Sequence, residues 1–95
     1  MKVNYTTNAF ASLVSLINFI ETNNSFGAGN RWLIRYETFL VEAFINANLI
    51  KLCNNSTFRQ LGLRCIYYND WVIAYSIIEN EILIEALLHK SRIVV

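Results

Sequence analysis

Residues 71–78, which read WVIAYSII, and residues 82–88, which read ILIEALL, decide the fold of this chain. Both runs are rich in β-branched, aromatic and aliphatic residues, which favour strands. The polar residues 79–81 between them are few enough for a hairpin turn. A third run of this kind, 58–68, is separated from the first by Asn69 and Asp70. The sequence therefore predicts an antiparallel meander of three strands.

Both faces of these strands are apolar. In the last run, Ile82, Ile84, Ala86 and Leu88 alternate with Leu83, Glu85, Leu87 and His89, and alternate residues of a strand point to opposite faces. Helices can cover one face, and we expect no further element long enough to cover the other. The open face is predicted around Tyr75, Leu83 and Leu87, or around their neighbours on the alternate face.

The first half of the chain predicts one short strand and two helices. Residues 2–6 alternate polar and apolar, and Thr7 and Asn8 are good helix N-caps. An apolar stripe at helical spacing follows within 9–20, and a second fits 28–46, with a polar turn between them. Residues 47–57 are interpreted as a loop or as the frayed end of the second helix. The predicted fold is a single α+β domain, 1–95, with the order β-α-α-β-β-β and a helix hairpin packed on one face of a small, mainly antiparallel sheet.

The composition excludes several classes of protein. The chain has 95 residues, of which 55% are hydrophobic and 16% charged, and its net charge is +1. Disorder is excluded by the high apolar content, and non-specific attraction to phosphate by the near-zero charge. A domain of this size leaves part of such an apolar surplus exposed. An exposed apolar patch of this kind indicates a surface that binds another protein.

No segment predicts a membrane span, which needs about 20 consecutive apolar residues. Lys2 precedes the apolar run 9–20, but polar residues separate the two and Asn18 interrupts the run. This pattern does not fit a secretory signal. We therefore expect a cytoplasmic protein without membrane contact.

The two cysteines, Cys53 and Cys65, are twelve residues apart, and no metal-ligand spacing can be built from them. We interpret them as reduced, partly buried thiols that act as small hydrophobic residues. A catalytic thiol paired with His89 is the alternative. We expect no metal site and no cofactor.

Cationic side chains form the one group of residues in the sequence that is suited to binding a ligand or to catalysis. Arg59 and Arg64 belong to the first run of the meander, and His89, Lys90 and Arg92 follow the last. If they converge, they could hold phosphate or support RNA cleavage; the alternative is that they solubilise a sheet edge and a tail. The interleaved aromatic residues Tyr67, Tyr68, Trp71 and Tyr75 allow base stacking, but strand aromatics more often pack in a core.

The order of elements and several segments together resemble the RelE/ParE toxin superfamily of bacterial toxin–antitoxin modules, closest to the ParE (plasmid stabilisation) branch. The matching segments are the opening strand 3–6, Asn30-Arg31-Trp32-Leu33, Phe58-Arg59-Gln60-Leu61, the strand 71–77 and the closing run 82–92 with His89 and Arg92. Arg59, Tyr75, His89 and Arg92 match positions of the family pattern. The chain departs from that pattern at 47–57, which lacks the Phe-Pro and Gly-x-Arg-Pro found in many members.

The resemblance implies a small toxin that is neutralised by a cognate antitoxin, with DNA gyrase as its target class. Partner-binding residues are then expected at Arg59, Tyr75, Leu83, Leu87, His89 and Arg92. The chain lacks the rich lysine and arginine set of ribosome-dependent RelE nucleases, which favours the non-enzymatic interpretation. One alternative is such an endoribonuclease, which would act on the ribosome through Arg59, Arg64, His89 and Arg92. Another is a degenerate, non-toxic member that forms a homodimer through the open sheet face.

Overall fold

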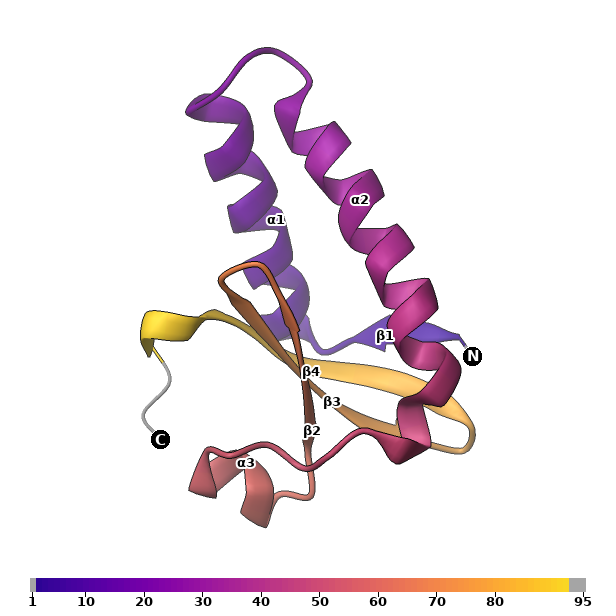
Figure 1. The fold of residues 1–95 in the computed structure, drawn as a ribbon. Helices are drawn as coiled ribbons and strands as arrows, with labels where there is room; N and C mark the ends of the chain where they lie inside the picture. Colours follow the sequence, from indigo (N-terminus) through magenta and orange to yellow (C-terminus); the bar gives the residue numbers. More distant parts are fainter. Residues whose placement is uncertain (1, 93–95) are drawn as a thin grey trace.

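A helix hairpin stands on one face of a four-stranded sheet in the computed structural model, which describes residues 2–92 (Figure 1). This is the predicted α+β fold with the order β-α-α-β-β-β. The main elements are β1 (Val3–Tyr5), α1 (Thr7–Thr22), α2 (Ala28–Ala43), β2 (Arg64–Tyr68), β3 (Trp71–Ile78) and β4 (Glu81–His89). Two short helices, η1 (Phe44–Leu49) and α3 (Ser56–Gln60), lie between α2 and β2, and a third, η2 (Lys90–Arg92), follows β4.

The strand order in the sheet is β1-β4-β3-β2. The last three strands form the predicted antiparallel meander, and β1 lies parallel to β4 at one edge. Both hairpin turns are tight because they place residues in the left-handed region, with φ 53° at Asn69, 51° at Glu79 and 64° at Asn80. No helix among residues 2–92 combines the length and the hydropathy needed to cross a bilayer.

The helix hairpin is fixed at both of its ends. Thr6 caps α1, one residue before the predicted caps, by accepting a hydrogen bond from the amide of Ala9 at 3.1 Å. At the tip, the Glu21 carboxylate accepts the amides of Gly27 and Gly29 at 2.8 and 2.9 Å. These two bonds hold the pKa of Glu21 below its ordinary value. The carboxylate therefore links the end of α1 to the start of α2.

The main core lies between the helix hairpin and the sheet. Five of its largest side chains are completely buried: Tyr36, Ile73, Tyr75, Ile82 and Ile84. The Tyr75 hydroxyl donates to the carbonyl of Ala47 in η1 at 2.8 Å. Tyr75 thus packs under the helices, and its expected place on the open face is wrong.

A β-bulge changes which face Leu87 occupies. The register between β3 and β4 shifts between Ala74 and Tyr75, which pair with Ala86 and Ile84, so Glu85 is the extra residue. Strict alternation is interrupted there, and Leu87 joins the main core with 2% of its surface exposed. The prediction that Leu87 lies on the open face is therefore also wrong. Leu83 precedes the bulge, lies opposite Ser76 and is half-buried.

The second face of the sheet has a cover that the sequence analysis did not predict. Residues 51–63 fold back under the sheet, and α3 lies on the side opposite the helix hairpin (Figure 1). The predicted strand 58–68 thus begins only at Arg64. A second, smaller core forms under this cover, made of Cys53, Leu63, Cys65, Val72 and Ala74, with Phe58 and Ala86 packed against it.

A disulfide joins this cover to the sheet. Cys53 and Cys65 are bonded to each other, which corrects the prediction of two reduced thiols. The bridge between Leu52 and Arg64 aligns the cover with β2, and the amide of Cys53 donates to the carbonyl of Leu63 at 2.9 Å. This pairing places the two cysteines side by side. Their burial, at 1% and 8% exposure, agrees with the small hydrophobic role expected of them.

Candidate functional site

A groove of about 790 Å³ runs between α1 and the end of β4. We call it the β4-end groove. Its α1 side is lined by Ala11, Ser12, Ser15, Leu16 and Phe19, and its sheet side by Trp71, Leu87, Leu88, His89, Ser91 and Arg92. It therefore contains two residues that the sequence analysis singled out, His89 and Arg92.

Two local features of the sequence create this groove. On α1, the small side chains of Ala11, Ser12 and Ser15 leave space beside the helix. On β4, the bulge that turns Leu87 toward the helices also turns His89 to the same side, two residues further along. The groove thus has an apolar base, which includes the buried Leu16 and Leu87, and a polar end at His89 and Arg92.

The imidazole of His89 is held in place by two neighbours. Its ring stands edge-on to Trp71, its cross-strand partner, with 5.3 Å between the ring centroids. Nδ1 lies 2.8 Å from the Ser91 hydroxyl oxygen and accepts the Ser91 amide at 3.2 Å. Because that amide can only donate, the neutral ring carries its proton on Nε2. Any proton donation by the neutral ring therefore involves Nε2.

Lys90 is engaged outside the groove. Its ammonium lies 3.0 Å from the Asp70 carboxylate, and its amide donates to the Asp70 carbonyl at 2.8 Å. The ammonium holds the pKa of Asp70 below its ordinary value. This pair ties the end of β4 to the turn between β2 and β3, and so fixes one end of the groove.

Arg59 and Arg64 both support the chain itself, and Arg64 lies far from His89. Arg59 donates from Nε to the carbonyl of Cys53 at 3.0 Å, and Arg64 donates to the carbonyl of Ile50. Arg64 pairs with Tyr75 whereas His89 pairs with Trp71, a separation of about 13 Å along β3 alone. The five cations therefore do not all converge on one site. Of the five, only His89 and Arg92 line the groove.

The interleaved aromatic residues serve mainly in packing. Tyr68 contacts the rings of Trp32, Tyr36 and Phe39, and both Trp71 and Tyr75 belong to the main core. Tyr67 points to the other face, with 56% of its surface exposed. The packing interpretation is thus confirmed for three of the four aromatic residues, and a continuous base-stacking platform is absent among them.

The α1 side of the groove was missed by the sequence analysis. Ala11, Ser15 and Phe19 recur every four residues, beside the core stripe of the same helix. That spacing is the signal that could have indicated a second contact face. Within residues 2–92, no three His, Cys, Asp or Glu side chains are grouped so as to hold a metal ion.

Comparison of the chain with protein-family models and with curated proteins found no match. Its function is therefore argued from the fold and from the β4-end groove.

Proposed function

We propose that this chain is a ParE-like toxin of a type II toxin–antitoxin module, which acts by binding proteins and is neutralised by a cognate antitoxin. One observation carries the proposal: the β4-end groove combines an apolar base with His89 and Arg92. Those two residues close the segment that most resembles the family. The order β-α-α-β-β-β is the one that the resemblance implies.

The groove has the chemistry of a site for a peptide segment. Phe19, Trp71 and Leu88 supply accessible apolar surface above the buried Leu16 and Leu87. Arg92 supplies a cation at one end. An amphipathic antitoxin segment that places an aliphatic side chain over the leucines and a carboxylate at Arg92 would satisfy both.

The positions of the cations favour binding over RNA cleavage. Arg59 and Arg64 each donate to a backbone carbonyl of the 50–53 segment. A RelE-like endoribonuclease would need them beside His89 to stabilise a developing negative charge. The endoribonuclease is therefore only an alternative to this proposal. The degenerate, non-toxic member is a second alternative.

Expression of the chain in a bacterial host, alone and with the adjacent small reading frame, tests the proposal. We expect growth arrest that the second frame relieves, and gyrase supercoiling inhibited by the purified chain with ribosome-bound mRNA intact. Arg92→Ala should weaken antitoxin binding by about tenfold, the effect of losing one charge-assisted contact. Lys51→Ala is the matched control, because Lys51 is an exposed cation that does not line the groove.

The outcomes separate the three functions. Cleavage of mRNA that requires His89 would support the endoribonuclease. Normal growth together with antitoxin binding would support the degenerate member. Normal growth with no binding of the neighbouring product would contradict all three.

A cytoplasmic location belongs to this proposal, and the disulfide provides its test. Thiols in the cytosol are kept reduced, whereas disulfides persist in oxidising compartments. Rapid acid quenching of cells, followed by alkylation and mass spectrometry, reports the state of Cys53 and Cys65. A target in the cytosol predicts two alkylated cysteines. A fully bonded pair would indicate an oxidising compartment and would contradict a gyrase target.

A further inference from the structure

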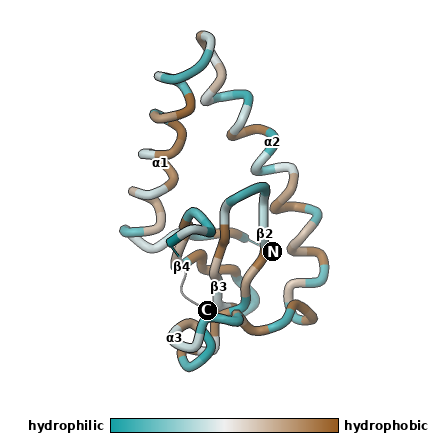
Figure 2. The backbone as a smooth tube through the Cα atoms, turned by 60° about the vertical axis from the view of Figure 1, so that its left-hand side comes forward, coloured by the Kyte–Doolittle hydropathy of each residue, from teal (hydrophilic) through white to brown (hydrophobic). Residues whose placement is uncertain are grey.

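The side of α2 that faces away from the sheet carries an exposed apolar stripe. Ile34 and Val41 on α2 are 56% and 71% exposed, and Ile45, which follows in the first turn of η1, is 74% exposed. On the opposite side of the helix, Trp32, Tyr36 and Leu40 are buried in the main core. Apolar residues consequently recur along the whole of α2 (Figure 2). Burial within the chain explains only one of the two faces.

The spacing of this stripe is that of a helix-pairing seam. Ile34, Thr38, Val41 and Ile45 follow one another at intervals of four, three and four residues. Such intervals keep side chains on one line toward a partner helix. Thr38, near the middle, is small enough for the partner to approach closely.

The charges beside the stripe identify the partner helix. Arg35 and Glu42 are exposed, lie seven residues apart on the same flank of the stripe, and make no ion pair with another described residue. When two helices pack antiparallel about a two-fold axis, each flank faces the same flank of the other copy. The first half of one helix then lies beside the second half of the other. Arg35 of each copy therefore meets Glu42 of the other.

We propose that two copies of this chain form a symmetric dimer through an antiparallel pair of α2 helices. Ile34 of one copy lies beside Ile45 of the second, and Thr38 lies beside Val41. A parallel pair is disfavoured because it joins opposite flanks of the stripe, which brings Glu42 near Glu37 of the second copy.

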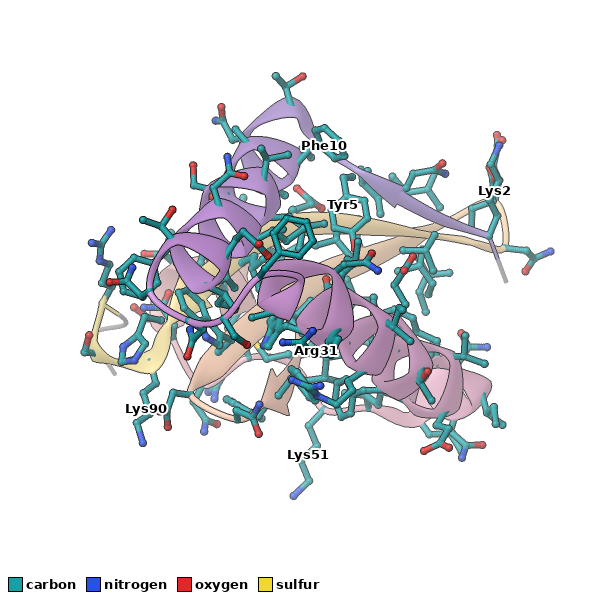
Figure 3. The ribbon with its side chains drawn as sticks, turned by 90° about the horizontal axis from the view of Figure 1, so that it is seen from above. Lys2, Tyr5, Phe10, Arg31, Lys51 and Lys90 are labelled. Atoms are coloured by element: carbon teal, nitrogen blue, oxygen red, sulfur yellow. A yellow bond between two sulfur atoms is a disulfide. The ribbon has the colours of Figure 1, made fainter. Side chains whose placement is uncertain are left out.

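A shallow groove next to the stripe enlarges the contact. Its volume is about 280 Å³, and it is lined by Val3, Tyr5, Glu37, Leu40, Val41, Phe44 and Ile45. The groove lies between β1 and α2, and Val41 and Ile45 belong both to it and to the stripe. Figure 3 shows Tyr5 beside Phe10 on this side of the molecule. An aliphatic side chain of the second copy can enter there.

Sedimentation velocity over a concentration series tests the dimer. The 11.0 kDa chain should double in mass as its concentration rises, with a dissociation constant of about 1–100 μM, as expected for a small interface. Val41→Asp and Ile45→Glu should each weaken dimerisation at least tenfold. Both sites are exposed in the single chain, so circular dichroism should show an unchanged fold. Leu61→Asp is the matched control, because Leu61 is 67% exposed but follows α3.

Charge reversal tests the antiparallel geometry. Arg35→Glu and Glu42→Arg should each weaken the dimer, and the double variant should restore it. In a parallel pair, Glu42→Arg alone would strengthen association by meeting Glu37. A chain that stays monomeric at 1 mM overturns the proposal, as does a dimer that is insensitive to Val41→Asp and lost with Leu83→Asp on the sheet.

Discussion

The hydroxyl oxygen of Tyr75 links the sheet to the helical layer in the middle of the core. Its ring packs edge-on against Phe44 with 4.9 Å between centroids, and its hydroxyl satisfies the carbonyl of Ala47. A buried carbonyl without a partner costs free energy. This single hydrogen bond therefore fixes η1, at the end of α2, over the middle of β3.

Tyr75→Phe should lower the free energy of unfolding by about 1–2 kcal/mol, because it removes the hydrogen bond and leaves the Ala47 carbonyl unsatisfied. Urea denaturation followed by circular dichroism measures this loss. Tyr67→Phe is the control, since Tyr67 is 56% exposed and its change should be near zero. Equal stability of the two variants would contradict the role given to this hydroxyl.

Buried phenols also predict a loss of stability in alkali. Burial raises the pKa of Tyr75 to about 12 and raises the pKa of Tyr5 and of Tyr36. The folded state thus keeps these protons while the unfolded chain releases them above about pH 10. Through these phenols, stability should not change between pH 8 and 10 and should fall between pH 10 and 12. Urea midpoints measured from pH 8 to 12 report the slope, and Tyr75→Phe should make it shallower.

Among the elements, α1 and α2 pack most closely where Gly29 lies against the α1 backbone. A Cβ atom on Gly29 would lie 2.8 Å from the carbonyl oxygen of Ile17, which is closer than real contacts allow. That oxygen belongs to the α1 backbone, so it cannot swing aside. The hairpin depends on the absence of a side chain at this point.

Gly29→Ala should therefore destabilise the chain by about 1–3 kcal/mol, the usual range for overpacking. The sign of this change in stability is informative, because a Gly-to-Ala replacement at an exposed helical position stabilises by about 1 kcal/mol. Thermal unfolding of Gly29→Ala should be compared with that of Asn30→Ala at the exposed neighbouring position. A higher melting temperature for Gly29→Ala would show that the helices can separate without cost.

Elements with a regular period were predictable from the sequence, and departures from it were not. The stripes of α1 and α2 and the alternation in β3 identified the fold. The bulge at Glu85 was not visible, because either register leaves β4 apolar on both faces. Leu87 was therefore assigned to the wrong face, while Leu83, which precedes the bulge, was not. Tyr75 was misplaced for another reason: the alternation of β3 does not say which of its two apolar faces the helices cover. His89 and Arg92 were found, but the α1 side of the groove was overlooked beside the stronger core stripe.

For the whole molecule, the decisive unpredicted feature is the cover on the second face. Residues 58–63 were assigned to a strand from their apolar content. In the structure the chain turns there and packs against the second face of the sheet. No side chain of α3 is buried. The cover is thus held by Cys53, Leu63 and Phe58, by a few backbone bonds and by the disulfide. Part of the apolar surplus is buried in this small core. The rest stays exposed, in the stripe that begins on α2 and at residues outside it such as Phe19, Phe26 and Leu49.

Replacement of both cysteines by alanine should release the cover while leaving the main core in place. The disulfide closes a loop between residues twelve apart, and loss of such a constraint costs about 3 kcal/mol. Hydrogen exchange should accelerate at residues 52–63 far more than at β3 and β4, because the core under the helices does not include the cysteines. The wild-type chain under a reducing agent should behave in the same way as the alanine variant. Uniform acceleration across the sheet would instead show that the two cores unfold as one, and that the disulfide supports the whole fold.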